Sequence, residues 1–149
     1  GVTVEMLRVE AAGAVKWRLS RASVVEAGEF SLFPGIERNL TVITGPGFDL
    51  IGSGLHLAAR PLVPVAFPGD VQIRAEAVTA PSDDFNVMTA RGLPLPEVTV
   101  VTSPQVLAAG GTLAVFALEA AGGLGRHDLL LSEGALTVAG PAIVVRLFG

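Results

Sequence analysis

Residues 33–42 read FPGIERNLTV, a Phe-Pro-Gly corner followed by a segment in which apolar Leu40 and Val42 flank polar Thr41. Proline fixes φ at the first central position of a turn, and glycine accepts the positive φ that follows. Alternation of apolar and polar residues places each kind on a different face of a β-strand. The stretch therefore predicts a tight turn followed by a strand with one buried face.

Glycine-proline corners and short alternating segments recur along the chain. Apolar Trp17 and Leu19 alternate with Arg18, for example, and no window of about twelve residues has a helical stripe with caps. The further corners are Gly45-Pro46-Gly47, Phe67-Pro68-Gly69-Asp70 and Gly140-Pro141. Many short strands joined at such corners are typical of a jelly roll, in which two packed sheets suppress exposed strand edges. We therefore expect an all-β jelly roll, or double-stranded β-helix.

The two halves of the chain are similar in the spacing of strands and corners. A shift of 73 residues pairs Leu40 with Leu113, Val42 with Val115, Val63 with Leu136, Val65 with Val138, Pro68 with Pro141 and Val71 with Val144. Coincidence in a valine-rich chain is the alternative, but the preserved spacing from strand to turn to strand favours duplication. We expect one compact domain over residues 1–149, made of two barrel halves near 1–91 and 92–149 that share a core.

Composition excludes several classes of protein. Half of the 149 residues are hydrophobic and 16% are charged, which is typical of a folded chain and not of a disordered one. The net charge is −4 and basic residues stand singly, so the sequence lacks the positive patch that nucleic-acid binding requires. The absence of cysteine excludes disulfides, thiolate catalysis and cysteine-based metal sites.

The longest stretch without a charged residue, Val98–Leu118, has the length of a membrane span. Ser103-Pro104-Gln105 and Gly110-Gly111-Thr112 interrupt it, so we expect two short strands there and no membrane partner. No basic segment leads into an apolar one, as a secretory signal requires. We therefore expect a cytoplasmic protein.

The sequence lacks the residues that several kinds of catalysis require. His56 and His127 are the only imidazoles, and neither has another histidine or a carboxylate at the spacing of metal ligands. Ser53 lies in a Gly-Ser-Gly turn and not in a nucleophile elbow, and no Lys-Ser or Lys-Thr follows a glycine-rich loop. We therefore expect no metal, no cofactor and no nucleotide site.

Polar residues next to the corners are the candidates for ligand binding. Arg38 and Glu37 follow the first corner, and Asp70 follows another. Arginine presents a rigid fork of donors that matches a carboxylate. The structural alternative is that Arg38 pairs with Asp70 or Asp84 to lock one end of the barrel. Asp70 has a further alternative, which is to accept backbone hydrogen bonds and finish its turn.

Asp84, Asn86 and Met88 are spaced two residues apart, so in a strand they share one face. Asp84 accepts hydrogen bonds and Asn86 both donates and accepts them, which favours recognition of a ligand over packing. Met88 would supply an adaptable apolar wall, with a simple core position as the alternative.

Three of these segments, in this order, resemble the HutD/Ves family of bacterial cupin-like proteins. They are Phe30–Arg38, Phe67–Asp70 and Asp84–Met88 with Arg91 and Gly92, preceded by Trp17–Ser20. Glu37 stands where the family more often has Asp, and the second half of the chain matches only as a hydrophobic strand pattern. Gly1–Thr3 resembles the end of a family segment that contains Trp and Asn, so we expect the complete family site to include residues upstream of Gly1.

The resemblance implies a metal-free, cupin-like bicupin. In the HutD branch it implies a protein that tunes histidine breakdown by sensing urocanate, formiminoglutamate or N-formylglutamate, and in the Ves branch a link to a stress response. We expect Arg38 to hold the carboxylate of such a small anionic metabolite, with carboxylates and an amide at its nitrogen end. The expected ligand-binding residues are Arg38, Asp70, Asp84, Asn86 and Glu37, the pocket wall is Phe33, Phe67 and Met88, and the structural turn residues are Pro34, Gly35, Pro68 and Gly69.

Two other classes of function stay open. One is a metal-independent isomerase or amide-handling hydrolase, in which Asp70 or Asp84, with a pKa raised by burial, acts as general base. The other is a structural or interaction module whose polar residues only lock corners. A mean hydropathy of +0.60 is high, so we expect a homodimer formed through an apolar sheet face, with a monomer as the alternative.

Overall fold

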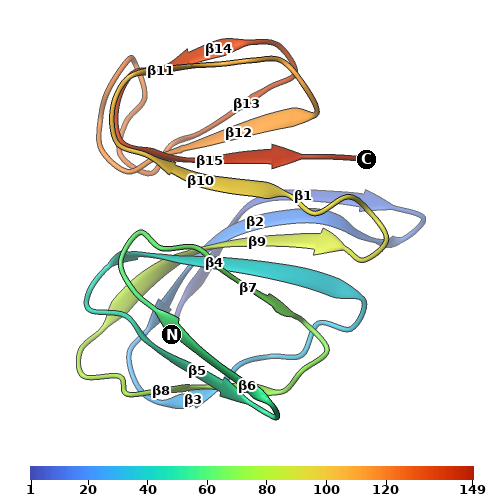
Figure 1. The fold of residues 1–149 in the computed structure, drawn as a ribbon, viewed down its shortest axis with the longest axis vertical. Coiled ribbons are helices and arrows are strands. Elements are labelled where there is room, and N and C mark those ends of the chain that lie inside the picture. Colours follow the sequence, from blue (N-terminus) through green and yellow to red (C-terminus); the bar gives the residue numbers. More distant parts are fainter. The chain divides into compact units, whose positions relative to one another are not determined.

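The computed structural model describes residues 1–149, which form β-strands joined by turns and loops. It contains no helix of the length and apolar character needed to cross a membrane. The chain forms two compact units, Gly1–Gly92 and Leu93–Gly149, which we call unit 1 and unit 2 (Figure 1). The prediction of an all-β protein is confirmed.

Unit 1 consists of two antiparallel sheets that face each other (Figure 1). The five-stranded sheet has the order β1 (Thr3–Ala11), β2 (Ala14–Val24), β9 (Ser82–Ala90), β4 (Ile36–Thr44) and β7 (Val65–Pro68). The four-stranded sheet has the order β3 (Gly28–Glu29), β8 (Ile73–Glu76), β5 (Phe48–Gly52) and β6 (Leu55–Ala59). The chain passes repeatedly between the two sheets, as in the jelly roll of a cupin.

The core of unit 1 joins side chains from both of its sheets. On β4, Leu40 and Val42 are fully buried and lie on the same face as Arg38, because alternate residues of a strand point the same way. Thr41 between them is buried as well, so the expectation of a single buried face is wrong for this strand. The core residues are Leu40, Val42, Phe48, Leu50, Ala59, Phe67, Ile73 and Ala75. Burial of each large apolar side chain stabilises the fold by about 1.5–3 kcal/mol.

The two predicted corners around Gly35 and Gly69 are present and are bonded to each other. The backbone N–H of Gly69 donates to the carbonyl of Ile36 at 2.8 Å, and the N–H of Phe33 donates to the carbonyl of Gly69 at 2.8 Å. Gly35 has a φ of +75°, a conformation that costs glycine no strain. This close approach of backbones fixes the position of Phe33, which lies next to Arg38.

Unit 2 contains a four-stranded sheet with the order β10 (Glu97–Val101), β15 (Ala142–Leu147), β12 (Thr112–Ala117) and β13 (Leu129–Ser132). A second pair is formed by β11 (Gln105–Leu107) and β14 (Leu136–Val138). The core residues of unit 2 are Val101, Leu107, Leu113, Val115, Val138, Ala142 and Val144. The charge-free stretch Val98–Leu118 therefore contains three strands, not the two that we expected, because Gln105–Leu107 pairs with β14.

The predicted duplication is not confirmed by the strand pattern. Leu40 and Leu113 both lie in buried strands, but Val71 lies in the loop between β7 and β8 whereas Val144 lies within β15. The 73-residue shift therefore does not align strand with strand throughout. Two similar halves with a shared core stay a prediction.

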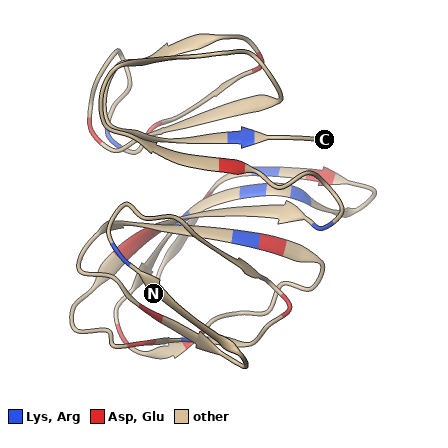
Figure 2. Ribbon diagram, in the orientation of Figure 1, with Lys and Arg blue, Asp and Glu red and all other residues tan.

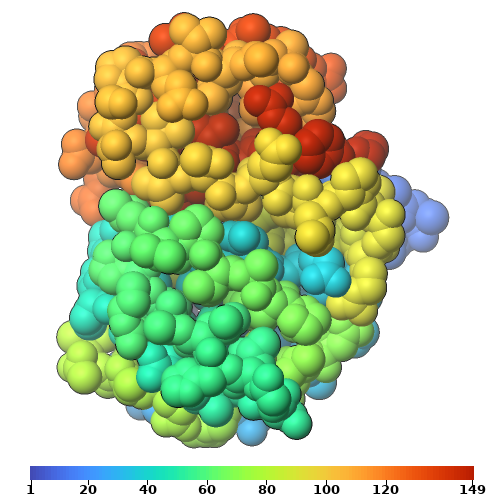
Figure 3. All heavy atoms as spheres, in the orientation of Figure 1, coloured from blue at the N-terminus to red at the C-terminus, as the bar shows by residue number.

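Charged and apolar side chains are scattered over the strands and loops of each unit. Figure 2 shows Lys and Arg on several elements of unit 1, half of them on β1 and β2, and at two positions in unit 2. Exposed Leu62 and Val63 lie in the loop between β6 and β7, which forms part of the face of unit 1 seen in Figure 3. Exposed apolar residues in small numbers are normal for a folded domain, and the homodimer stays a prediction.

We expect Gly69→Ala to destabilise the protein by about 2 kcal/mol or more, because the new methyl group collides with the carbonyl oxygens of Phe33 and Ile36. Gly134→Ala is the matched control, since a Cβ atom at Gly134 meets nothing within 4 Å, and we expect no loss of stability there. Urea unfolding measures both variants. Equal stability of the two would contradict the close packing of the corners.

Candidate functional site

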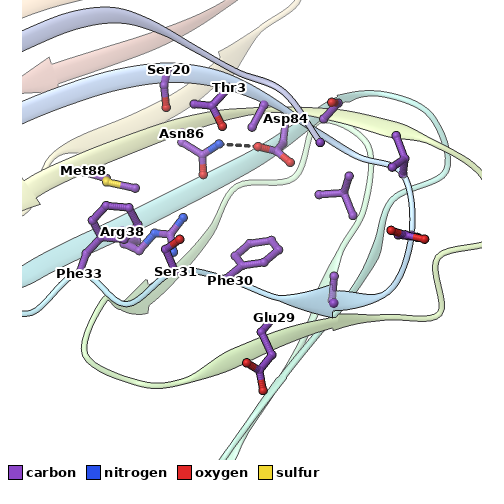
Figure 4. Close-up of a pocket in the computed structure, with 18 of the residues that line it drawn as sticks. Thr3, Ser20, Glu29, Phe30, Ser31, Phe33, Arg38, Asp84, Asn86 and Met88 are labelled. Carbon is purple, nitrogen blue, oxygen red and sulfur yellow. Dashed lines mark hydrogen bonds between the residues drawn. The ribbon is translucent and has the colours of Figure 1, made fainter.

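A cavity of about 560 Å³ opens in unit 1 against the inner face of the five-stranded sheet (Figure 4). The sheet supplies one wall, and the segment from the end of β2 through Phe33 supplies the other. In Figure 4, Asp84 and Asn86 on β9 point into the space opposite Phe30. The lining residues that bear hydrogen-bonding or charged groups are Thr3, Arg18, Ser20, Ser23, Glu26, Glu29, Ser31, Arg38, Asp84 and Asn86.

The register of β9 with β2 and β4 determines which side chains lie next to one another on the sheet wall. Met88 is paired with Arg18 of β2 on one side and with Arg38 of β4 on the other. Two residues along β9, Asn86 is paired with Ser20 and Leu40, and two further on Asp84 is paired with Ala22 and Val42. Rows two residues apart are separated by about 6.6 Å along the strand. The wall therefore changes from cationic through neutral polar to acidic.

Arg38 is held by aromatic rings and has no acidic partner. Its guanidinium carbon lies 5.0 Å from the ring centres of Phe33 and Phe67 and 5.5 Å from that of Phe30. The side chain is 9% exposed, and its Nε has no hydrogen-bond partner. Burial, reinforced by the charge of Arg18 and opposed by Asp84, lowers the pKa of Arg38 to about 10. Arg38 therefore stays positively charged at neutral pH, with ring faces as its support.

Asp84 lies at the other end of the wall, and only one of its two carboxylate oxygens has a hydrogen-bond partner. Its side chain is 1% exposed; Asn86 Nδ2 donates to Oδ1, and Oδ2 has no hydrogen-bond partner. Burial raises the pKa of Asp84 to about 7, with a smaller contribution from Asp83, while the hydrogen bond from Asn86 and the charge of Arg38 oppose the shift. This carboxyl group can therefore gain or lose a proton near neutral pH.

Unpaired polar atoms at the two ends of one cavity wall indicate a ligand site. Buried polar atoms in folded proteins nearly always have a hydrogen-bond partner, and each exception calls for an explanation. Here Arg38 offers N–H groups and Asp84 offers an oxygen, and both line the same cavity. The arrangement can hold an anionic group at the Arg38 end and a hydrogen-bond donor at the Asp84 end.

Glu37 and Asp70 do not line this cavity, contrary to expectation. Glu37 is adjacent to Arg38 on β4 and so points to the opposite face, where its Oε1 accepts from Arg91 Nε at 2.7 Å. Arg91 Nη2 also donates to Asp70 Oδ1 at 2.5 Å, and the N–H of Gly35 donates to Asp70 Oδ2 at 3.2 Å. Arg91 and, less strongly, Gly35 lower the pKa of Asp70 to about 2.

The barrel end is therefore locked by Arg91, and not by Arg38 as the structural alternative proposed. Asp70 completes its turn by accepting a backbone hydrogen bond, which is the structural alternative that the sequence offered for this residue. Arg38 is left free to contact a ligand. Of the remaining expected residues, Asn86, Met88 and Phe33 line the cavity, and Phe67 lies beside the guanidinium of Arg38.

Sequence reasoning missed several residues of the site. Arg18 and Ser20 line the cavity from β2, and Phe30 faces them from the other wall. The signal for the first two was present, since Arg18 and Ser20 alternate with apolar Trp17 and Leu19 and must share a face. Nothing in the local pattern indicated that this face is the same one that Asp84 and Asn86 occupy.

The residues of the cavity do not fit a metal ion. No histidine lines it, and no three His, Cys, Asp or Glu side chains gather as ligands anywhere in the structure. The one buried carboxylate of the wall, Asp84, faces a cavity that also holds two arginines. Positive side chains at this density disfavour a cation.

Comparisons with known proteins agree with one another. The family model described as HutD matches residues 1–140. HutD from Pseudomonas fluorescens SBW25, determined in a formate condition, is 31% identical with a TM-score of 0.87, and the match covers 99% of this chain and 88% of that chain. A conserved protein of unknown function from Pseudomonas aeruginosa PAO1 is 28% identical with a TM-score of 0.83, over 96% and 86%. YhaK from Escherichia coli, at 10% identity and a TM-score of 0.68 over 98% and 92%, shares the fold.

We expect Asp84→Asn to stabilise the protein at pH 8 by up to about 4 kcal/mol, at about 1.4 kcal/mol per pKa unit. The folded protein keeps the Asp84 proton up to about pH 7, whereas the unfolded chain loses it near the model value of 3.8. The stability that this carboxyl group contributes is therefore fully present below pH 4 and is lost as the pH rises to 7. The advantage of the variant should grow through the same window.

Urea unfolding of both proteins at pH 4, 6 and 8 measures this effect. Asp83→Asn is the comparison variant, because it removes an exposed carboxylate of the same strand that contributes only slightly to the pKa of Asp84, and we expect a much smaller pH-dependent effect from it. An advantage of Asp84→Asn that is independent of pH would contradict the raised pKa.

Proposed function

The chain belongs to the HutD family and is a cupin-like protein linked to histidine utilisation, and from this premise we propose that the cavity of unit 1 binds a small anionic metabolite of that pathway. Binding lets the protein sense the metabolite and modulate histidine utilisation in the cytoplasm. Urocanate, formiminoglutamate and N-formylglutamate are the candidate ligands. A volume of about 560 Å³ is in the range of small-molecule sites.

One observation carries the proposal: Arg38 is buried, charged and without an acidic partner in the wall of a cavity. Removal of an unpaired charge from water is costly, so a protein retains such a group where a partner arrives from outside. A ligand carboxylate matches the donor fork of arginine in two parallel hydrogen bonds. The three phenylalanine rings around Arg38 hold the fork in position before the ligand binds.

Among the three candidates, urocanate matches the wall best. It has one carboxylate, a flat conjugated chain and an imidazole N–H at the opposite end. The carboxylate meets Arg38, the N–H meets the unpaired Oδ2 of Asp84, and the flat middle lies beside Phe30 and Phe33. N-formylglutamate and formiminoglutamate each have a second carboxylate, which Asp84 and the cavity residues Glu26 and Glu29 would repel.

Arg38→Ala is expected to weaken urocanate binding about ten- to a hundredfold, because loss of a buried charge-assisted contact costs about 1.5–3 kcal/mol. Arg74→Ala is the control: Arg74 is an exposed arginine on β8 that pairs with Glu76 at 2.9 Å, and its loss should leave binding unchanged. Titration calorimetry measures the affinity. Absence of binding of all three metabolites to the unaltered protein would refute the proposal, and equal affinity of the two variants would refute the role of Arg38.

A second candidate function is catalysis, and the observation that favours it is the pKa of Asp84. A general base works best when its pKa lies near the operating pH, and burial raises that of Asp84 to about 7. The protein would then act as a metal-independent isomerase or amide-handling hydrolase on the same metabolites. Arg38 would orient the substrate carboxylate while Asp84 moves a proton.

Turnover distinguishes the enzyme from the binding protein. Each metabolite is incubated with the protein, and the products are followed by mass spectrometry. If the protein only binds, all three metabolites are recovered unchanged, which is the result that we expect. Conversion that is lost in Asp84→Asn, while Asp83→Asn retains it, would establish catalysis and overturn the binding-only function.

A further inference from the structure

A second arginine faces the cavity from the strand on the other side of β9. Arg18 on β2 and Arg38 on β4 flank Met88 in one row, and both line the cavity. Neighbouring strands lie about 4.8 Å apart, so the two backbones are about 10 Å apart across β9. Each arginine side chain is long enough for the two guanidinium groups to meet a single small group above Met88.

Arg18 is held from outside the cavity by a carboxylate on β1. Its Nε donates to Glu5 Oε1 at 2.7 Å, and its Nη1 lies 3.9 Å from Met88 Sδ. Glu5 itself does not line the cavity. The contacts with Glu5 and Met88 use Nε and Nη1, which leaves Nη2 for a further partner, and the side chain is 18% exposed. The Nε side of the Arg18 guanidinium is therefore fixed by Glu5, and the Nη2 side is open to a ligand.

The proximity of the two arginines is unfavourable without an anion. Like charges that share a site destabilise each other, and the charge of Arg18 contributes to the lowered pKa of Arg38. Glu5 pairs with both Arg18 and Arg8, and Glu10 also pairs with Arg8, so these four charges balance one another. No carboxylate lies within ion-pair distance of Arg38. The row therefore carries about one unbalanced positive charge on the cavity side.

We propose that Arg18 is a second ligand-binding residue that contacts the same anionic group as Arg38, and that Glu5 is the positioning residue that aims Arg18 into the cavity. The identity of the anion as a urocanate carboxylate rests on the proposed function, whereas the pair of guanidinium groups does not. One unbalanced charge fits one carboxylate. The site thus prefers ligands with a single carboxylate at this end.

The experiment compares urocanate with its methyl ester, which has the same shape but no charge at the carboxylate end. Arg18→Met keeps an unbranched apolar stem at this position and removes the guanidinium group with its charge. We expect it to weaken urocanate binding about tenfold and the binding of the ester less than about twofold. Arg18→Lys should recover part of the affinity for urocanate. Equal losses for acid and ester, or no loss for either, would overturn the assignment of Arg18.

Glu5→Gln tests the positioning role. The amide can still accept a hydrogen bond from Arg18 but lacks the charge, so we expect urocanate binding to weaken about threefold and binding of the ester to stay unchanged. Glu10→Gln is the matched control, because Glu10 lies on the same strand and pairs only with Arg8, at 3.1 Å. A similar loss in both glutamine variants would show a general effect of strand charge and overturn the role of Glu5.

Sodium acetate separates this inference from the proposed function. Its carboxylate fits between the two guanidinium groups without any contact to Asp84. Acetate should raise the melting temperature of the unaltered protein above that in sodium chloride at equal ionic strength, and the increase should vanish in Arg18→Met. If acetate has this effect and urocanate does not bind, the two arginines form an anion site, and the proposal of a histidine-pathway ligand is wrong. No specific effect of acetate would overturn the pair.

Discussion

The antiparallel register of β9 between β2 and β4 is the constraint on which the site depends. It places Arg18, Met88 and Arg38 in one row and Asp84 two rows further along the strand. A shift of one residue would turn all of these side chains to the opposite face of the sheet. Leu40 and Val42 prevent such a shift, because they are fully buried in the core on the same face of β4 as Arg38. Packing of the core therefore also orients the polar wall of the cavity.

The same wall lowers the stability of the folded protein. Arg38 and Asp84 are each removed from water without a direct ion pair, and each has an atom without a hydrogen-bond partner. Hydrophobic burial in the core of unit 1 offsets this cost, since a large apolar side chain contributes about 1.5–3 kcal/mol. Binding sites commonly retain such destabilised groups because a ligand supplies the missing contacts.

Two arginines of unit 1 differ in role because of the faces on which they lie. Arg91 is exposed and pairs with Glu37 and Asp70, and it joins the two corners of the unit. Arg38 is directed to the inside by the alternation of β4, and its guanidinium lies over phenylalanine rings instead of pairing with a carboxylate. Glu37 and Arg38 are neighbours in the chain, but adjacent residues of a strand point to opposite faces. Glu37 therefore forms a structural ion pair on one face, and Arg38 lines the ligand site on the other.

The sequence by itself determined the local features of this protein. The Pro-Gly corners, the strands and the shared face of Asp84, Asn86 and Met88 follow from φ preferences and from the period of two residues in a strand. Only the tertiary structure decided which carboxylate pairs with which arginine, because pairing between strands joins residues far apart in the chain. The sequence therefore predicts Asp70 and Glu37 as ligand-binding residues, whereas in the structure both form ion pairs with Arg91. Arg18 reaches the site because β2 and β4 flank β9, an arrangement that no local pattern contains.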